Sequence, residues 1–147
     1  MAQIRHIAIQ TQDEEATANF YVDNFGLTKV RKLESERTSG YYLTDGHINV
    51  AILRFKNDKV AGVERGVGWS GIHHIGFQVE SLEDTERKLE ASGAARPRHD
   101  INEALGLIAG GHRAGGGNVE VRYAGPDNVN FDISQTGWVG TPSNKVP

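Results

Sequence analysis

The chain has 147 residues, a formal net charge of −3 and no cysteine. This length suits one compact domain or two small fused modules that share a core. Without cysteine the chain has neither disulfides nor thiolate metal sites, and its weak negative charge gives no electrostatic reason to expect nucleic acid or a membrane surface as a partner. No apolar run approaches the roughly 20 residues that span a bilayer, so we expect a cytoplasmic protein.

The first part of the chain predicts a β-α-β-β-β order of elements. Residues 4–10 alternate as a strand does, with Ile7 and Ile9 on one face and His6 on the other. A capping box that starts at Thr11 precedes an amphipathic helix over residues 13–25, which Gly26 ends. Three short strands are expected next, over residues 27–33, 40–44 and 48–55.

The second part predicts a similar order after a polar linker over residues 56–70. Residues 71–79 read as a strand, and a helix follows from Ser81 to Gly93. Further strands are expected over residues 94–101, 118–123 and 129–134. The glycine-rich stretch 102–117 is expected to be a loop that borders the functional site, because long loops of this kind are often functional.

The two parts repeat one short phrase. Arg-His-Ile-Ala-Ile-Gln at residues 5–10 aligns with His-His-Ile-Gly-Phe-Gln at residues 73–78, which places His6 on His74. In a regular strand, His73 faces away from the side that His74 faces. A single histidine on a strand is more often a hydrogen-bonded structural residue than a metal ligand, but two that coincide under one alignment indicate paired half-sites.

Asp132 supplies a carboxylate for the same site. It lies in the predicted strand 129–134, on the face opposite Phe131 and Ile133. A carboxylate buried there costs several kcal/mol unless it is paired or coordinated. Two imidazoles and one carboxylate suit a divalent ion with open coordination positions. We therefore predict metal ligation by His6, His74 and Asp132. The alternative for Asp132 is a structural role, as the cap of a turn or the partner of an arginine.

Further polar residues are weaker candidates. Those expected to line the substrate pocket are Gln10, Asn49 and Gln78. Candidates for a catalytic acid or base are Tyr42, Tyr123 and His112, each of which is more often a packing or loop residue.

Four phrases together are similar to the vicinal oxygen chelate superfamily: residues 5–9, the helix end at 19–27, residues 74–79, and residues 125–132. That superfamily includes glyoxalase I, extradiol dioxygenases, methylmalonyl-CoA epimerase, and fosfomycin and bleomycin resistance proteins. The resemblance implies an α+β fold of paired β-α-β-β-β modules, about 3–55 and 71–135 in a single domain over 1–147. Their curved mixed sheets would form a cup around a metal.

Carried over by position, the resemblance makes His6, His74 and Asp132 the ligands. Ala51 stands at the fourth position and cannot ligate, and aspartate replaces the usual glutamate. The implied function is a metal-dependent enzyme (Fe, Mn, Zn, Ni or Co) that acts on a small molecule with neighbouring oxygen atoms. The most similar types are an extradiol-type dioxygenase and a glyoxalase-like lyase or isomerase. Because the fourth protein ligand is missing, the resemblance favours ring cleavage or thiol transfer over glutathione-hemithioacetal isomerisation.

The resemblance leaves one alternative open, a metal-free binding protein of the bleomycin-resistance type. It also implies a homodimer as one possible assembly. We expect such a dimer to share its sites, with His6 from one chain and His74 and Asp132 from the other.

Overall fold

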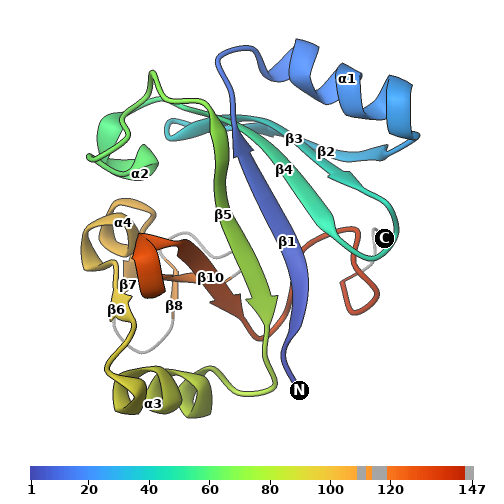
Figure 1. The fold of residues 1–147 in the computed structure, drawn as a ribbon. Coiled ribbons are helices and arrows are strands. Elements are labelled where there is room, and N and C mark those ends of the chain that lie inside the picture. The colour runs from blue at the N-terminus through green and yellow to red at the C-terminus, as the bar shows by residue number, and fades with distance from the viewer. Residues whose placement is uncertain (109–111, 114–118, 145–147) are drawn as a thin grey trace.

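The computed structural model describes residues 1–108, 112, 113 and 119–144. Eight strands form one twisted mixed sheet in the order β2-β3-β4-β1-β5-β10-β9-β6, which does not close into a barrel (Figure 1). Two short strands, β7 (Leu107–Ile108) and β8 (His112–Arg113), pair separately. The expected α+β fold of two similar modules is confirmed. No helix in the described part of the chain has the length and apolar character needed to cross a membrane.

The first module has the predicted order of elements. These are β1 (Gln3–Gln10), α1 (Glu14–Phe25), β2 (Thr28–Glu34), β3 (Thr38–Thr44) and β4 (Asn49–Phe55). The expected capping box is wrong in one respect: Asp13, not Thr11, caps α1, accepting a hydrogen bond from the Ala16 amide. The Thr11 hydroxyl instead bonds the hydroxyl of Thr17 at 2.7 Å. Gly26 ends the helix in the left-handed conformation, as predicted.

The second module repeats this order, and its last three strands are shorter than those of the first module. Its elements are β5 (Gly71–Gln78), α3 (Leu82–Ser92), β6 (Arg96–Pro97), β9 (Val121–Ala124) and β10 (Asn130–Ser134). β1 runs parallel to β4, and β5 runs parallel to β10. Since β1 also pairs antiparallel with β5, both modules belong to one continuous sheet.

Two predictions within the second module are wrong. The strand expected over residues 94–101 stops at Pro97. The Arg98 amide still bonds the Arg122 carbonyl at 2.8 Å, but the Arg122 amide donates to the Asn102 side chain and not to the expected strand. The glycine-rich stretch does not begin as a loop, because helix α4 (His99–Ala104) covers its first residues. Asn102 holds this helix in place: its side chain accepts from the Arg122 amide at 2.7 Å and donates to the Arg122 carbonyl at 3.1 Å. Residues 109–111 and 114–118 of the expected loop lie outside the described residues.

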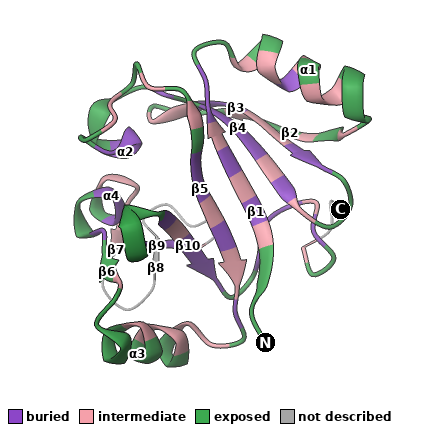
Figure 2. Ribbon diagram, in the orientation of Figure 1, coloured by how far each residue is buried: buried purple, intermediate pink, exposed green. Residues whose placement is uncertain are grey.

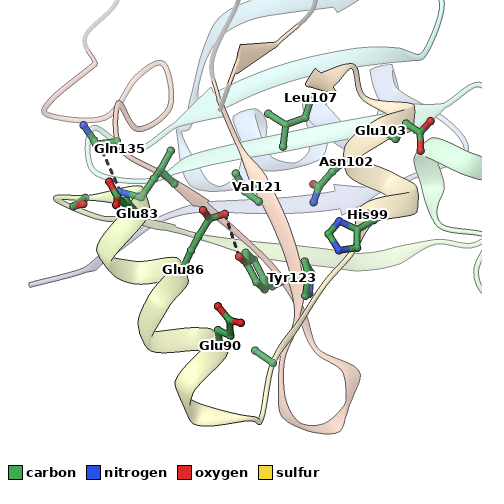
Figure 3. Close-up of a pocket in the computed structure, with 14 residues that line it drawn as sticks. Glu83, Glu86, Glu90, His99, Asn102, Glu103, Leu107, Val121, Tyr123 and Gln135 are labelled. Carbon is green, nitrogen blue, oxygen red and sulfur yellow. Dashed lines mark hydrogen bonds between the residues drawn. The ribbon is translucent and has the colours of Figure 1, made fainter. Parts of the chain in front are cut away.

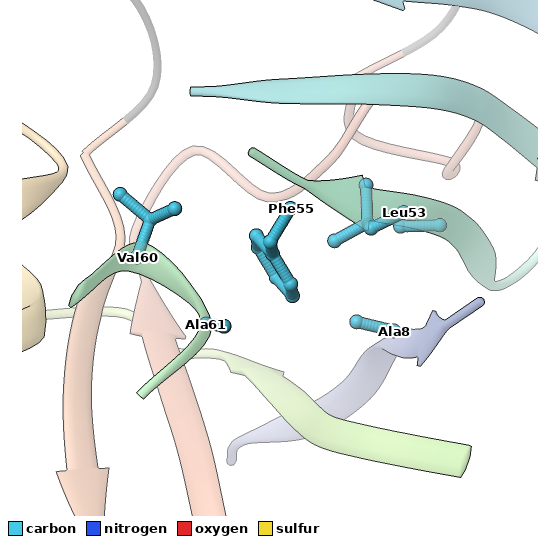
Figure 4. Packing of buried hydrophobic residues seen from close by; sticks show 6 residues of the cluster. Ala8, Leu53, Phe55, Val60 and Ala61 are labelled. Carbon is cyan, nitrogen blue, oxygen red and sulfur yellow. The ribbon is translucent and has the colours of Figure 1, made fainter. Parts of the chain in front are cut away.

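The expected linker also contains structure. Helix α2 (Asp58–Ala61) lies within it and is capped by the side chain of Asn57. Val60 and Ala61 are buried against Phe55 in a cluster on one face of the sheet (Figure 4). The polar composition of the segment predicted a linker, but the packing of its two buried residues holds it against this face of the sheet.

The two faces of the first module differ in the size of their side chains. Helix α1 covers one face (Figure 2). On that face Ala18 packs with Leu43 and Ile52. The opposite face carries the small residues Ala8 and Ala51 at its centre. Small side chains there leave open space over the sheet, and the candidate site lies in that space.

Candidate metal centre

Three buried side chains converge where the two modules meet. His6, His74 and Asp132 are exposed by only 3%, 3% and 1%. The two Nε2 atoms are 3.1 Å apart, and His74 Nε2 lies 3.2 Å from Asp132 Oδ2. All three ligand atoms lie within 4.8 Å of one another. The structure brings them together within one chain, whereas the expected dimer would divide them between two subunits.

Strand register explains the convergence. His6 lies opposite Gly76 across the antiparallel pair, and Asp132 lies opposite Gly76 on the other side. The glycine therefore sits between two of the candidate ligands and leaves room for both. Ala51 lies opposite Ala8 just as Asp132 lies opposite Gly76, so alanine does occupy the equivalent fourth corner.

A bulge in β5 turns His73 toward the site. Ala8 pairs with His74 and Ile9 with Ile72, which leaves His73 as the additional residue. The prediction that His73 faces away is therefore wrong, because the strand is not regular at this point. His73 is 1% exposed, and its Nδ1 lies 2.7 Å from Nδ1 of His74.

Hydrogen bonds fix the tautomer of His74. His73 Nε2 lies 2.6 Å from the Ala61 carbonyl, which can only accept, so Nε2 carries the proton. Burial lowers the pKa of His73 to about 2, so its Nδ1 has no proton and accepts from His74 Nδ1. Burial, and then the charge of Arg122, lower the pKa of His74 to about 3. We infer that His74 is neutral with a lone pair on Nε2.

Asn49 fixes the tautomer of His6 in the same way. Its Nδ2 donates to the Val139 carbonyl at 2.9 Å, so its Oδ1 faces His6 Nδ1 at 2.8 Å as an acceptor. His6 Nδ1 therefore carries the proton. Burial lowers the pKa of His6 to about 4 against the opposing charge of Asp132, so the ring is neutral and Nε2 holds a lone pair.

Two lone pairs thus point into one small space, a repulsive arrangement that a bound cation relieves. Ligand nitrogens about 2.1 Å from a shared ion lie roughly 3.0–3.4 Å apart, depending on coordination geometry. The 3.1 Å between His6 Nε2 and His74 Nε2 falls within that range. The outer hydrogen bonds from His73 and Asn49 are of the kind that orient metal-binding histidines. The donor set fits a divalent ion.

Arg122 also lies at this candidate metal centre, although the sequence motifs did not predict it as a site residue. Its Nε and Nη2 both donate to the Asp132 carboxylate, Nη2 at 3.0 Å from Oδ2. Nη2 also lies 3.2 Å from His74 Nε2, whose lone pair accepts from it. Burial raises the pKa of Asp132, but the charge of Arg122 outweighs burial and holds that pKa well below its usual range. The aspartate is therefore ionised.

A cavity of about 680 Å³ opens over these residues. His6, His74 and Arg122 line its floor, and Trp138 lies stacked on His6 with ring centroids 4.7 Å apart. The apolar part of its wall consists of Leu33, Ala51, Leu53, Phe55, Leu105 and Val139, together with the Trp138 ring. Leu105 comes from the stretch expected to border the site.

The weaker candidates lie in different places. Tyr42 lines the cavity, across the strand pair from Ala51. Tyr123 lies on the other face, in a cavity of about 1190 Å³ beside α3, where its hydroxyl bonds Glu86 at 3.1 Å (Figure 3). Burial, followed by Glu86, raises the pKa of Tyr123. The side chain of His112 lies outside the described residues.

None of the three predicted pocket residues lines the cavity over the histidines. Gln10 is buried and donates to the Gly66 carbonyl at 2.9 Å. Gln78 accepts from Ser143 at 2.8 Å near the end of β5. Asn49 acts behind His6, as described above.

Gly76 offers a test of the close packing behind the site. A Cβ at this position would lie 2.7 Å from His6 Cβ and 2.7 Å from the Trp138 ring. We expect Gly76→Ala to lower the free energy of unfolding by roughly 1–3 kcal/mol, as overpacking does, when measured by urea denaturation. Gly68→Ala is the matched control, since its Cβ would meet nothing within 4 Å. Equal stability of the two variants would contradict this description of the packing.

Comparison with known proteins agrees with the fold. The family model of the Glyoxalase/Bleomycin resistance protein/Dioxygenase superfamily matches residues 3–132. None of the curated proteins matches the chain in sequence. A hypothetical protein from Bacillus halodurans C-125 superimposes with a TM-score of 0.67 at 17% identity, over 90% of this chain and 93% of its own.

Two similar structures are epimerases. A variant of Streptomyces coelicolor methylmalonyl-CoA epimerase in complex with 2-nitronate-propionyl-CoA gives a TM-score of 0.65 at 18% identity, covering 89% of this chain and 94% of that one. The methylmalonyl-CoA epimerase of Mycobacterium tuberculosis gives 0.62 at 15% identity, over 89% and 85%. At these identities the likeness establishes the fold alone.

Proposed function

Because the chain belongs to the Glyoxalase/Bleomycin resistance protein/Dioxygenase superfamily, we propose that it is a divalent-metal-dependent enzyme acting on a small molecule with neighbouring oxygen atoms. His6, His74 and Asp132 are the proposed ligands. The ion is one of Fe, Mn, Zn, Ni or Co, which imidazole and carboxylate ligands suit. Ala51 leaves the fourth corner to the substrate or to water.

One observation carries this proposal. The Nε2 atoms of His6 and His74, each with a lone pair, lie 3.1 Å apart beside the ionised carboxylate of Asp132, and Arg122 Nη2 donates to the one on His74. Both rings are neutral, so no proton of their own relieves the repulsion. A buried arrangement of this kind is costly unless it serves to bind a cation.

Each residue has a definite task in such a site. A bound divalent ion supplies polarisation of an oxygen on the substrate. His73 and Asn49 hold the two imidazoles in their ligating tautomers. The apolar wall and the Trp138 ring exclude water, which strengthens electrostatic interactions at the floor. Tyr42 is the proposed proton donor or acceptor, since it lines the cavity and is half-buried.

Two assays distinguish a lyase or isomerase from a dioxygenase. Protein loaded with each of the five ions is incubated without oxygen in D₂O with 2-oxo acids, 2-hydroxy acids and acyl thioesters, and exchange at the α-carbon is followed by NMR. Oxygen uptake is then measured with catechols. Exchange that requires the ion identifies a lyase or isomerase, and oxygen uptake identifies a dioxygenase. Absence of both, with metal bound, would contradict an extradiol-type dioxygenase and a glyoxalase-like lyase or isomerase.

Arg122 favours one second candidate, a metal-free binding protein of the bleomycin-resistance type. The guanidinium already neutralises Asp132 and donates to His74, so the centre is electrically balanced without an ion. This candidate predicts that the purified protein takes up no metal and turns over no substrate. A homodimer also stays a proposal, which light scattering can test.

A further inference from the structure

The helices of the two modules differ in how closely they pack on the sheet. Ala18 of α1 is fully buried and packs with Leu43 and Ile52. Helix α3 has no buried residue, and its Leu82 and Leu89 contact the apolar cluster of the second module as half-buried side chains. A cavity of about 1190 Å³ lies between α3, α4 and β9 (Figure 3). It is large enough for a small molecule, since pockets of about 300 to 1,000 Å³ bind drug-sized ligands.

The floor of this cavity is apolar. Val121 and Tyr123 of β9 lie there, each 7% exposed, and Leu107 of β7 and Ala95 lie beside them. Tyr123 alternates with Arg122 along β9, so the cavity lies on the face of the sheet opposite the candidate metal centre. Covering apolar surface with a ligand in place of water is favourable. The floor therefore favours a ligand with an apolar body.

The side of α3 that faces this floor is acidic. Leu82, Glu86 and Glu90 follow one another at intervals of four residues and therefore share one face of the helix. All three line the cavity. The Tyr123 hydroxyl donates to Glu86 at 3.1 Å (Figure 3). Burial, followed by the charges of Glu86 and Glu90, raises the pKa of Tyr123, so both carboxylates lie near this hydroxyl.

The other charges around the cavity do not cancel these two carboxylates. No lysine or arginine of the described residues lines it, and its one histidine, His99, is exposed to solvent. Glu83 also lies at the cavity, but the exposed Arg87 pairs with it at 3.3 Å. Glu103 of α4 adds a further carboxylate to the lining. The cavity thus combines an apolar floor with a negatively charged wall.

We propose that this cavity binds a small organic cation, with an ammonium group at Glu86 and Glu90 and an apolar body on the floor formed by Val121 and Leu107. An ammonium group donates charge-assisted hydrogen bonds to carboxylates. An alkyl chain loses its contact with water when it lies on an apolar floor. The site is separate from the metal centre, so it adds a second binding activity to the proposed function and does not depend on it.

Hexylammonium, hexanol and hexanoate test the proposal, because they share one alkyl chain and differ in the charge of the head group. Each is titrated into the protein, and the amide shifts of α3 and β9 are followed by ¹H–¹⁵N NMR. We expect hexylammonium to bind at least about tenfold more tightly than hexanol, and hexanoate to bind more weakly still. Equal affinities, shifts confined to other elements, or no binding of hexylammonium at about 10 mM would overturn the site.

Neutral replacements of the two carboxylates test the ammonium contact. The double variant Glu86→Gln, Glu90→Gln keeps the side-chain size and an acceptor for Tyr123. We expect it to bind hexylammonium at least about tenfold more weakly and hexanol as before. Asp84→Asn is the matched control, since it removes an exposed carboxylate of α3 that lies outside the cavity. Hexylammonium affinity that the double variant leaves unchanged would refute the assignment.

Filling the cavity tests the place of the alkyl chain. Ala95→Phe puts a ring into the lining, and we expect it to weaken both hexylammonium and hexanol by at least about tenfold, since the space they need is occupied. Ala94→Phe is the control, because Ala94 is exposed and outside the cavity. Unchanged binding by an Ala95→Phe protein that still unfolds cooperatively would overturn the proposal. If Ala95→Phe does not fold, the glutamine double variant decides.

Discussion

Replacing His74 by alanine is expected to abolish divalent-metal binding while the fold survives. His74 supplies a lone pair at the point where the three ligand atoms meet, 3.1 Å from His6 Nε2 and 3.2 Å from Asp132 Oδ2. Loss of an outer hydrogen bond to a metal ligand costs 10–100-fold in affinity, so loss of the ligand itself should cost at least about a hundredfold. Competition titration with a chromophoric chelator measures this change.

His47→Ala is the matched control for that experiment, because His47 is an exposed histidine outside the cavity. His74→Ala should retain cooperative unfolding, since the apolar clusters around α1 and α3 do not include His74. A loss of about 1–3 kcal/mol in unfolding free energy is expected from the missing bond to His73. Metal affinity that His74→Ala leaves unchanged would rule out the proposed ligand set.

Arg122→Gln is expected to have the opposite effect and to strengthen metal binding by about tenfold or more. The Arg122 guanidinium carries a positive charge beside the centre, and its Nη2 donates to the same His74 lone pair that an ion would use. Removing it frees both that lone pair and the Asp132 carboxylate. The same chelator titration gives the affinity, with Arg54→Gln as the control, because this exposed arginine lies outside the cavity.

The sign of this change distinguishes two roles for Arg122. Stronger binding in Arg122→Gln means that the guanidinium competes with the ion. Weaker binding would contradict the competition and would mean that Arg122 mainly orients Asp132 for the ion.

Much of the fold could be predicted because its signals are local. Alternation of apolar residues identifies β1 and β5, and the repeated histidine phrase aligns His6 with His74. Ser81 and Gly93 bound α3 as expected from capping chemistry. These features depend on neighbouring residues, so the sequence displays them directly.

The missed features depend on contacts between distant residues. The turn of His73 toward the site arises from the pairing of β5 with β1, which periodicity alone does not show. Helix α4 is held by the bonds between Asn102 and Arg122, 20 residues apart in the sequence. Arg122 alternates with Tyr123 in the strand, so its face was predictable. The pairing of Arg122 with Asp132 was not predictable, because it depends on the register of β9 against β10.

The most direct test of the metal centre is a long-range ¹H–¹⁵N correlation spectrum of the histidine rings at neutral pH, before and after one equivalent of zinc. We predict that His6 and His74 are both neutral with the proton on Nδ1 in the metal-free protein, as their bonds to Asn49 and His73 require. Zinc should then shift both Nε2 resonances together. A proton on either Nε2 before zinc is added, or rings that one equivalent of zinc leaves unchanged, would contradict the proposed centre.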